Sequence, residues 1–501
     1  MYVLCATSRN DCSLTLCGVG QAISIDILPD HVLLAVFDFC VNHDVVGDPI
    51  FEHIFAKFEE DMVAWQSLIH VCRRWRGIIF GSPRRLNLRL VCTSKPLASN
   101  TLNLWPTLPL LVHVRDRVSQ TEDVDNVVAV LECRDRVNEI YLYDVNSSQL
   151  EKILAVLHEP FPELTHLLLR SNGAVPVLPD SLLGGSASRL RLLWLERIPF
   201  PALPKLLSSA THLVSLRLDE IPHSGYISPE AIVATLSTLA NLRSLSLKFN
   251  SPLSRPNWAS RHPPLKTRIV LPALTHIRFE GVSEYLDNLV APIDVPRLSK
   301  LFITFFNQIL FNTPQFIQFI KRAPMLKALG KARIAFGDRA VKVQISSEAS
   351  SSPYEVLDVR ILCTELDWQV SSLEQVFIPS FPPLSTLEEL YIFQAPHSHP
   401  HWQDNLENTL WLELLHRFST VKNLYLCEKF APRIGSAFEE LVIEETTEVL
   451  PTLQNIILEG LETSGFYDEG IAQFVGMRGY SRHPVDVFHW DDSVLDKALR
   501  G

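Results

Sequence analysis

The chain has 501 residues, of which 47% are hydrophobic and 20% are charged, and its net charge is −11. Because disordered chains combine low hydrophobicity with high net charge, this composition indicates that most of the chain folds, as about three domains or one repeat array. An acidic protein is poorly suited to holding phosphate backbones, so we expect no nucleic acid partner.

Residues 1–23 predict an amino-terminal extension with little fixed order. Arg9 and its polar neighbours interrupt the apolar run that a secretory signal needs, and no window of about 18 residues in the chain predicts a membrane span. The chain has nine scattered cysteines and no CxxC pair. An odd number of unpatterned cysteines indicates reduced thiols, so we expect a cytoplasmic or nuclear protein.

Residues 24–90 contain two helical patterns, separated by an acidic stretch at 41–63. The first pattern begins at Leu28-Pro29, and its apolar stripe consists of Val32, Leu33, Val36, Phe37 and Cys40. The second stripe consists of Trp65, Leu68, Ile69, Cys72, Trp75 and Ile79. A helical module this small buries little of its own apolar surface, so we expect part of these stripes to contact a partner or the rest of the chain.

From residue 137 onward the pattern apolar-x-x-apolar-x-apolar recurs every 23 to 34 residues. Ten clear copies begin at Val137, Leu164, Leu190, Leu213, Leu242, Leu274, Leu298, Leu387, Val421 and Leu453, and two weaker copies at Leu326 and Val356 fill the one large gap. Each copy predicts a short strand with one buried face. Between strands, Ser228-Pro229 and Thr313-Pro314 each predict a capped helix start, and 406–418 is a third helical stretch.

A strand, a turn, a helix and a turn at this period resemble the leucine-rich-repeat solenoid. We therefore expect an α/β chain: a small all-helical module, a connector at 91–136, a solenoid of short parallel strands and helices at 137–462, and a cap and tail at 463–501. The polar residue that follows each strand in that family is present at Asn172 and Asn250 but is replaced by apolar residues in most copies. The arc is therefore expected to be uneven.

The residues that alternate with the buried strand positions predict a binding surface on the concave face. The position between the last two apolar residues of a copy carries an aromatic residue or arginine in seven copies: Tyr141, Trp194, Arg217, Arg278, Phe302, Tyr391 and Tyr425. These residue types are enriched at protein-binding hot spots, so we expect a protein ligand. The alternative is that loops or neighbouring side chains cover some of them.

Two strings in residues 24–90 resemble the F-box. Leu28-Pro29-x-x-Val32-Leu33-x-x-Val36-Phe37 is followed by Leu68-x-x-Val71-Cys72-Arg73-x-Trp75. Together with the repeats, this stretch is similar to a large fungal group of F-box proteins with irregular leucine-rich repeats. Two departures are His31, where the family usually has glutamate, and the insertion at 41–63.

This resemblance implies the substrate-recognition subunit of an SCF-type cullin-RING ubiquitin ligase, in which the F-box holds a Skp-type adaptor and the repeats hold a protein substrate. Carried over by position, the adaptor contacts would be Leu28, Pro29, Val32, Leu33, Val36, Phe37, Leu68, Val71, Cys72 and Trp75. The alternative role for each of these residues is the module's own core.

The motifs predict no catalytic residue, cofactor or metal, and hence no enzyme. His397, His399 and His401 lack a cysteine or carboxylate partner and are better explained as a loop than as a metal site. A repeat scaffold that binds proteins without any ligase connection is the alternative function, and a hydrolytic or redox enzyme is the third.

Overall fold

A computed structural model of the protein describes residues 4–6, 14–18, 20–24, 27–41, 64–83, 85–86, 88–93, 108–114, 121–173, 177–254, 268–326, 329–346, 356–377, 381–395, 398, 408–443, 449–459, 469–479 and 484–490. The chain divides into two compact units. The first consists of residues 1–144, 155–157 and 161–164, and the second of residues 145–154, 158–160 and 165–501. The insertion at 41–63 lies outside the described residues, apart from Val41 at the end of a helix.

The first unit begins with a small antiparallel sheet, where the sequence led us to expect little order. Its strands are β1 (Leu4–Ala6), β2 (Leu14–Gly18) and β3 (Gly20–Ser24), and β2 pairs with both of the others. The sequence gives a weak signal here, since these strands are short.

Three helices follow: α1 (Asp30–Val41), α3 (Ala64–Ile69) and α4 (Arg73–Gly81). They pack on one another around Leu33, Phe37, Trp75 and Ile79, and the rings of Phe37 and Trp75 lie 4.7 Å apart. These core residues are the inward-facing members of the two predicted apolar stripes.

The predicted connector at 91–136 is more regular than expected. It contains most of β4 (Leu90–Cys92), then β5 (Leu110–Val114) and α6 (Thr121–Leu131), and leads to β6 (Val137–Val145). Strands β4, β5 and β6 are parallel neighbours. The repeat architecture therefore begins before the first clear copy of the leucine pattern.

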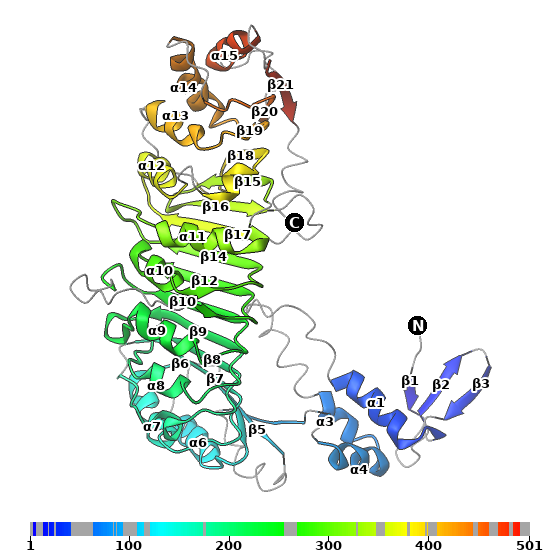
Figure 1. Cartoon of the computed structure of the whole chain (residues 1–501). Coiled ribbons are helices and arrows are strands. Elements are labelled where there is room, and N and C mark those ends of the chain that lie inside the picture. Colours follow the sequence, from blue (N-terminus) through cyan, green and yellow to red (C-terminus); the bar gives the residue numbers. More distant parts are fainter. Residues whose placement is uncertain are drawn as a thin grey trace. The chain divides into compact units, whose positions relative to one another are not determined.

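The second unit is a long, mainly parallel sheet whose strands alternate with helices (Figure 1). Its parallel strands are β7 (His166–Ser171), β8 (Leu192–Glu196), β9 (Ser215–Ile221), β10 (Ser244–Phe249), β12 (His276–Gly281), β14 (Lys300–Phe305), β17 (Leu357–Leu362), β18 (Glu389–Gln394), β19 (Asn423–Leu426), β20 (Asn455–Glu459) and β21 (Asp486–Trp490). The short strands β11 (Ile269–Val270) and β13 (Ile293–Asp294) form a separate parallel pair.

The helices of this unit lie along one side of the sheet, and neighbouring helices pack on one another from α8 to α11 and from α12 to α15 (Figure 1). They are α7 (Ser147–Leu157), α8 (Leu203–Leu207), α9 (Pro229–Leu236), α10 (Ser283–Val290), α11 (Pro314–Arg322), α12 (Leu366–Val376), α13 (Asn408–His416), α14 (Ala431–Ile443) and α15 (Glu469–Gly479). Each clear copy of the leucine pattern coincides with a strand, and its apolar residues are buried. We call the opposite side of the sheet the open face.

One segment breaks the simple succession of repeats. The strand order here is β14-β17-β16-β15-β18. Strands β15 (Lys331–Phe336) and β16 (Ala340–Ser346) form an antiparallel hairpin. The three strands β15, β16 and β17 stand in the sheet in the reverse of their chain order, so that β16 pairs with β17 and β15 pairs with β18. The prediction of a copy starting at Leu326 is wrong by three residues. The register pairs Lys331 with Glu389, so the copy starts at Leu329 and continues through Ala332 and Ile334. The sequence pattern missed this copy because Ala332 stands at its fourth position, where the clear copies have a larger apolar residue.

Both predicted helix starts are confirmed, because α9 begins at Pro229 and α11 at Pro314, but only the first has the predicted side-chain cap. The Ser228 hydroxyl accepts a hydrogen bond of 3.3 Å from the amide of Ala231 and caps α9, as predicted. Thr313 makes no such bond at the start of α11. Asp287 of α10 replaces it, since its carboxylate accepts from the amides of Gln315 and Phe316 at 2.7 and 2.9 Å.

Among the described residues, no helix has the length and apolar character needed to cross a membrane.

Candidate functional site: the open face of the sheet

The strand register aligns four predicted residues, together with Ser246, in one row across the open face. Trp194, Arg217, Ser246, Arg278 and Phe302 occupy equivalent positions on consecutive strands β8, β9, β10, β12 and β14. Beyond them the row continues through Asp358, Gln344 and Arg333 of the reversed hairpin region to Tyr391 and Tyr425. We call this line the central row.

The exposure of these side chains differs along the central row. Arg278 is exposed, and Arg217, Phe302 and Tyr425 are half-buried. Trp194 and Tyr391, in contrast, are only 8% and 7% exposed. The guanidinium of Arg217 lies 3.8 Å above the ring of Trp194 and covers it, a cation–π contact. Covering by a neighbouring side chain, the alternative that the sequence left open, therefore applies to Trp194.

A second row, one strand position further on, is densely charged. Arg170, Glu196, Asp219, Lys248 and Glu280 each follow the last apolar residue of a pattern copy. Arg170 pairs with Glu196 at 3.2 Å, and Lys248 lies 3.6 Å from Asp219. Arg217 also pairs with Asp219, whose carboxylate accepts a 3.1 Å hydrogen bond from the Ser246 hydroxyl. We call this set the charged row.

The charged row is partly desolvated. Burial raises the pKa of Glu196 and of Glu280 above the ordinary value of a glutamate, although neighbouring cations oppose the shift. Burial also lowers the pKa of Lys248 below that of a free lysine, against the effect of Asp219. Ion pairs held in this way are stronger and more directional than those at an open surface. Sequence reasoning missed the row, although the signal was a charge at one pattern position in five successive copies.

A separate aromatic platform lies on β18 and β19. The rings of Tyr391 and Tyr425 stack with centroids 3.9 Å apart and an interplanar angle of 3°. The Tyr391 hydroxyl donates to Glu389 at 3.0 Å, and the ammonium of Lys331 lies 4.4 Å above the Tyr391 ring and 3.2 Å from Glu389. Burial raises the pKa of both tyrosines, so both stay protonated at neutral pH.

Tyr141 belongs to the first unit and is 6% exposed. Its hydroxyl donates a 3.1 Å hydrogen bond to Glu139, which is also paired with Arg89. The ring of His113 on β5 meets that of Tyr141 edge-on at 6.3 Å. Tyr141 is thus the centre of a buried polar cluster within that unit.

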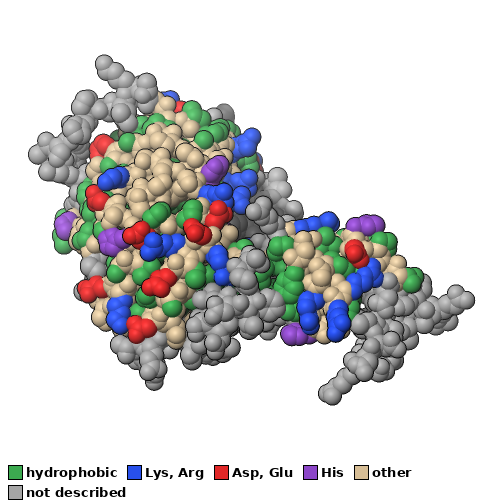
Figure 2. Space-filling model, turned by 90° about the horizontal axis from the view of Figure 1, so that it is seen from below, with side chains coloured by type: hydrophobic (Ala, Val, Ile, Leu, Met, Phe, Trp, Pro, Cys, Tyr) green, Lys and Arg blue, Asp and Glu red, His purple; other side chains and the backbone are tan. Residues whose placement is uncertain are grey.

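The ten predicted adaptor contacts differ in how deeply the helical module buries them. Leu33, Phe37 and Trp75 are buried in its own core. Pro29, Val36 and Val71 are exposed, the two valines each at 40%, and the remaining four are half-buried: Leu28, Val32, Leu68 and Cys72. Two further exposed apolar side chains, Ile27 and Phe39, were not predicted. Figure 2 shows hydrophobic side chains at the surface of this module beside those of lysine and arginine.

Within the described residues, no three histidine, cysteine or acidic side chains gather as metal ligands would. The predicted loop with His397, His399 and His401 lies outside the described residues. The described part of the open face thus presents rings and paired charges on a rigid sheet, an arrangement suited to contacting another polypeptide.

Comparison with known proteins adds little. No family model matches the chain, and no curated protein does. Among solved structures, the leucine-rich repeat-containing protein LegL7 from Legionella pneumophila matches 78% of this chain and 98% of its own, at 14% identity and a TM-score of 0.26. At so low a TM-score the likeness does not establish a common fold, and the α/β repeat architecture follows from the strand register of this chain alone.

Proposed function

We propose that the protein is the substrate-recognition subunit of an SCF-type cullin-RING ubiquitin ligase. One observation carries the proposal: the F-box-like strings fall on a helical module that buries Leu33, Phe37 and Trp75 in its own core and still exposes Pro29, Val36 and Val71. Exposed apolar side chains on so small a module are best explained by a partner that covers them. That partner would be a Skp-type adaptor, in the cytoplasm or the nucleus.

The open face would hold the substrate, a protein of unidentified sequence. Arg278, Phe302 and Tyr425 leave surface available on the central row, and the Arg217 guanidinium presents its outer side above Trp194. Aromatic and arginine side chains on a rigid support lose little entropy on binding, which favours them as anchors. The paired charges of the charged row would select partners by electrostatic complementarity.

In this role the protein performs no chemical step. Its contribution is proximity, because holding the substrate and the ligase on one chain raises their effective concentration for transfer by other subunits.

The test measures binding of the purified full-length protein to a purified Skp-type adaptor by isothermal titration calorimetry. The test variant is Val36→Asp/Val71→Asp, which introduces charge at two exposed positions and leaves the core of Leu33, Phe37 and Trp75 intact. The matched control is Val177→Asp, at a valine that is 50% exposed in the second unit. We expect the wild type and the control to bind and the double variant to fail, with unchanged circular dichroism.

A wild-type protein that is folded and does not bind the adaptor would contradict the proposal. The remaining function would then be a repeat scaffold that binds proteins through its open face and has no ligase connection. Equal binding by the wild type and the double variant would instead place the adaptor contacts elsewhere.

A further inference from the structure

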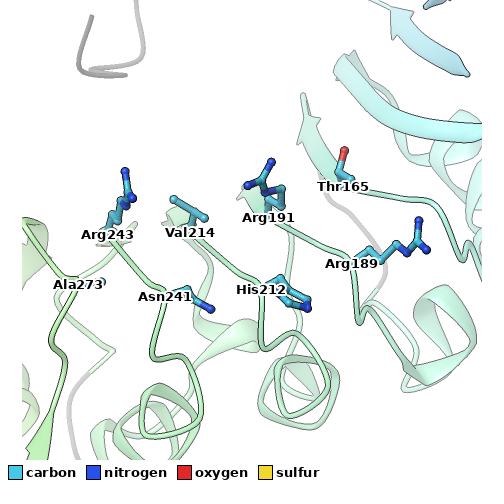
Figure 3. A pocket seen from close by; sticks show the side chains of 8 residues that line it. All are labelled: Thr165, Arg189, Arg191, His212, Val214, Asn241, Arg243 and Ala273. Carbon is cyan, nitrogen blue, oxygen red and sulfur yellow. The ribbon is translucent and has the colours of Figure 1, made fainter. Parts of the chain in front are cut away.

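A basic groove of about 460 Å³ lies at the leading edge of the sheet in the second unit, where strands begin. Its lining residues are Thr165, Arg189, Arg191, His212, Val214, Asn241, Arg243 and Ala273 (Figure 3). We call it the leading-edge groove. It is separate from the central row and the charged row, and none of the functional assignments above uses it.

The groove is built from two pattern positions repeated over four copies. Thr165, Arg191, Val214 and Arg243 each stand one residue after the first leucine of a copy. Backbone hydrogen bonds of 2.7 to 2.8 Å join them in series, from the amide of each residue to the carbonyl of the one before. Because neighbouring strands lie about 4.8 Å apart, Arg191 and Arg243 stand on the order of 10 Å apart.

The side chains of this series point the same way. In Figure 3 those of Arg191, Val214 and Arg243 project together to one side of the chain, so that the valine separates the two guanidinium groups. The second series consists of Arg189, His212, Asn241 and Ala273, which lie one residue before Leu190, Leu213, Leu242 and Leu274, and it also lines the groove. Arg189, Arg191, His212 and Arg243 are exposed.

None of the eight residues that line the groove is acidic. Within the described part of the chain, neither Arg191 nor Arg243 forms an ion pair with another described residue. The chain as a whole carries a net charge of −11, so this concentration of positive charge runs against its average.

At the same pattern position further along the unit, a cation is paired with a carboxylate. Lys422 also stands one residue after the first apolar residue of its copy, and its ammonium pairs with Glu388 of the neighbouring strand at 2.7 Å. The amide of Lys422 donates to the carbonyl of Glu388 at 2.9 Å, as Arg243 does to Val214. At the pattern position where the later copy has Glu388, the neighbours of Arg243 and Arg191 are Val214 and Thr165. Among the described residues, no carboxylate takes the place of Glu388 beside Arg191 or Arg243, which leaves both guanidinium groups available to a ligand.

We propose that the leading-edge groove binds an acidic peptide segment in an extended conformation. Carboxylates two to four residues apart would pair with Arg191 and Arg243, since an extended chain advances about 3.3 Å per residue. A small apolar side chain between them would contact Val214. A polypeptide fits this alternation of charge and apolar surface better than a nucleic acid, which the net charge of the chain would repel.

The experiment measures fluorescence polarisation of a fluorescein-labelled peptide that repeats Asp-Ala-Glu, mixed with the full-length protein. The test variant is Arg191→Glu/Arg243→Glu. The matched control is Lys321→Glu/Lys429→Glu, which changes the net charge equally at two exposed positions outside the groove. We expect the dissociation constant to rise about tenfold or more in the test variant and to stay within about twofold in the control.

Two further measurements keep the outcome unambiguous. A peptide that repeats Asn-Ala-Gln is expected not to bind, and Arg191→Gln/Arg243→Gln, which keeps side-chain length and polarity, is expected to weaken binding of the acidic peptide with unchanged circular dichroism. No binding by the wild type, an equal loss in the control variant, or tighter binding of a labelled oligothymidylate than of the peptide would each overturn the proposal. None of these results depends on whether the helical module binds a Skp-type adaptor.

Discussion

Glu196 and Asp219 are register partners on adjacent strands with different surroundings. Asp219 is met by Arg217, Lys248 and the Ser246 hydroxyl, whereas the single ion pair of Glu196 is with Arg170. Burial is the largest influence on Glu196 and raises its pKa, and the nearby Asp219 raises it further. The folded protein therefore holds a proton on Glu196 at a pH where the unfolded chain has already released it.

This difference predicts how stability changes with pH. Between about pH 4.5, the ordinary pKa of glutamate, and the raised pKa of the folded state, the folded protein binds more protons than the unfolded chain. The contribution of Glu196 to the free energy of unfolding is therefore present at acid pH and declines as the pH rises through this window. Glu196→Gln removes the contribution, so the wild type should lose stability relative to the variant as the pH rises.

Urea denaturation of both proteins at a series of pH values from about 4.5 to 7 gives this difference directly. A difference that does not change with pH, or one that grows in favour of the wild type, would contradict the assignment. The wild-type curve alone is not sufficient, because other carboxylates titrate in the same range.

At the level of single elements, helix α11 shows a cap supplied from outside its own sequence. Asp287 reaches from α10 to the first amides of α11, and this bond couples two neighbouring repeats as well as ending one helix. A carboxylate at a helix amino terminus is also favoured by the helix dipole. Thr313, the residue expected from sequence to cap the helix, makes no cap bond.

Replacing the two residues should therefore have unequal effects. Asp287→Ala removes both accepted hydrogen bonds and should lower the free energy of unfolding by about 1–2 kcal/mol. Thr313→Val keeps the shape and removes the hydroxyl, and should change it by no more than about 0.5 kcal/mol. Chemical denaturation measures both. A larger loss in the free energy of unfolding for Thr313→Val than for Asp287→Ala would mean that Thr313, and not Asp287, caps α11.

For the second unit as a whole, the series of repeats predicts that damage stays local. In a repeat array each copy contacts mainly its neighbours, so stability is close to a sum of local terms. Leu216 on β9 is fully buried, and β9 pairs with β8 and β10. Leu216→Ala should cost about 2–5 kcal/mol through the cavity that it leaves.

Hydrogen exchange followed by mass spectrometry can locate that loss. We expect the amides of β8, β9 and β10 to exchange faster in Leu216→Ala, while those of β19 and β20 keep their wild-type rates. Equal acceleration throughout the unit would mean that it unfolds as one cooperative block.

The strands of this unit could be read from the sequence because their signal is local. A strand with one buried face must alternate apolar residues, and a copy such as Leu190/Leu193/Leu195 carries the whole pattern within six positions. The cap at Ser228 is equally local, because donor and acceptor are three residues apart. The six predicted positions of the central row also followed from this alternation, although not their exposure.

What the sequence could not supply are contacts between residues of different repeats. The pairing of β15 with β18, the cap from Asp287 and the cover of Arg217 over Trp194 each join residues some 23 or more positions apart. The same holds for Lys422, which finds Glu388, and for Arg191 and Arg243, which find no described carboxylate. Burial of a leucine is a property of one residue type in one pattern, whereas pairing of a charge depends on which side chain the next strand places opposite it. For that physical reason the sequence determines where most strands of the second unit lie, and the folded sheet decides which of their outward side chains remain available to a partner.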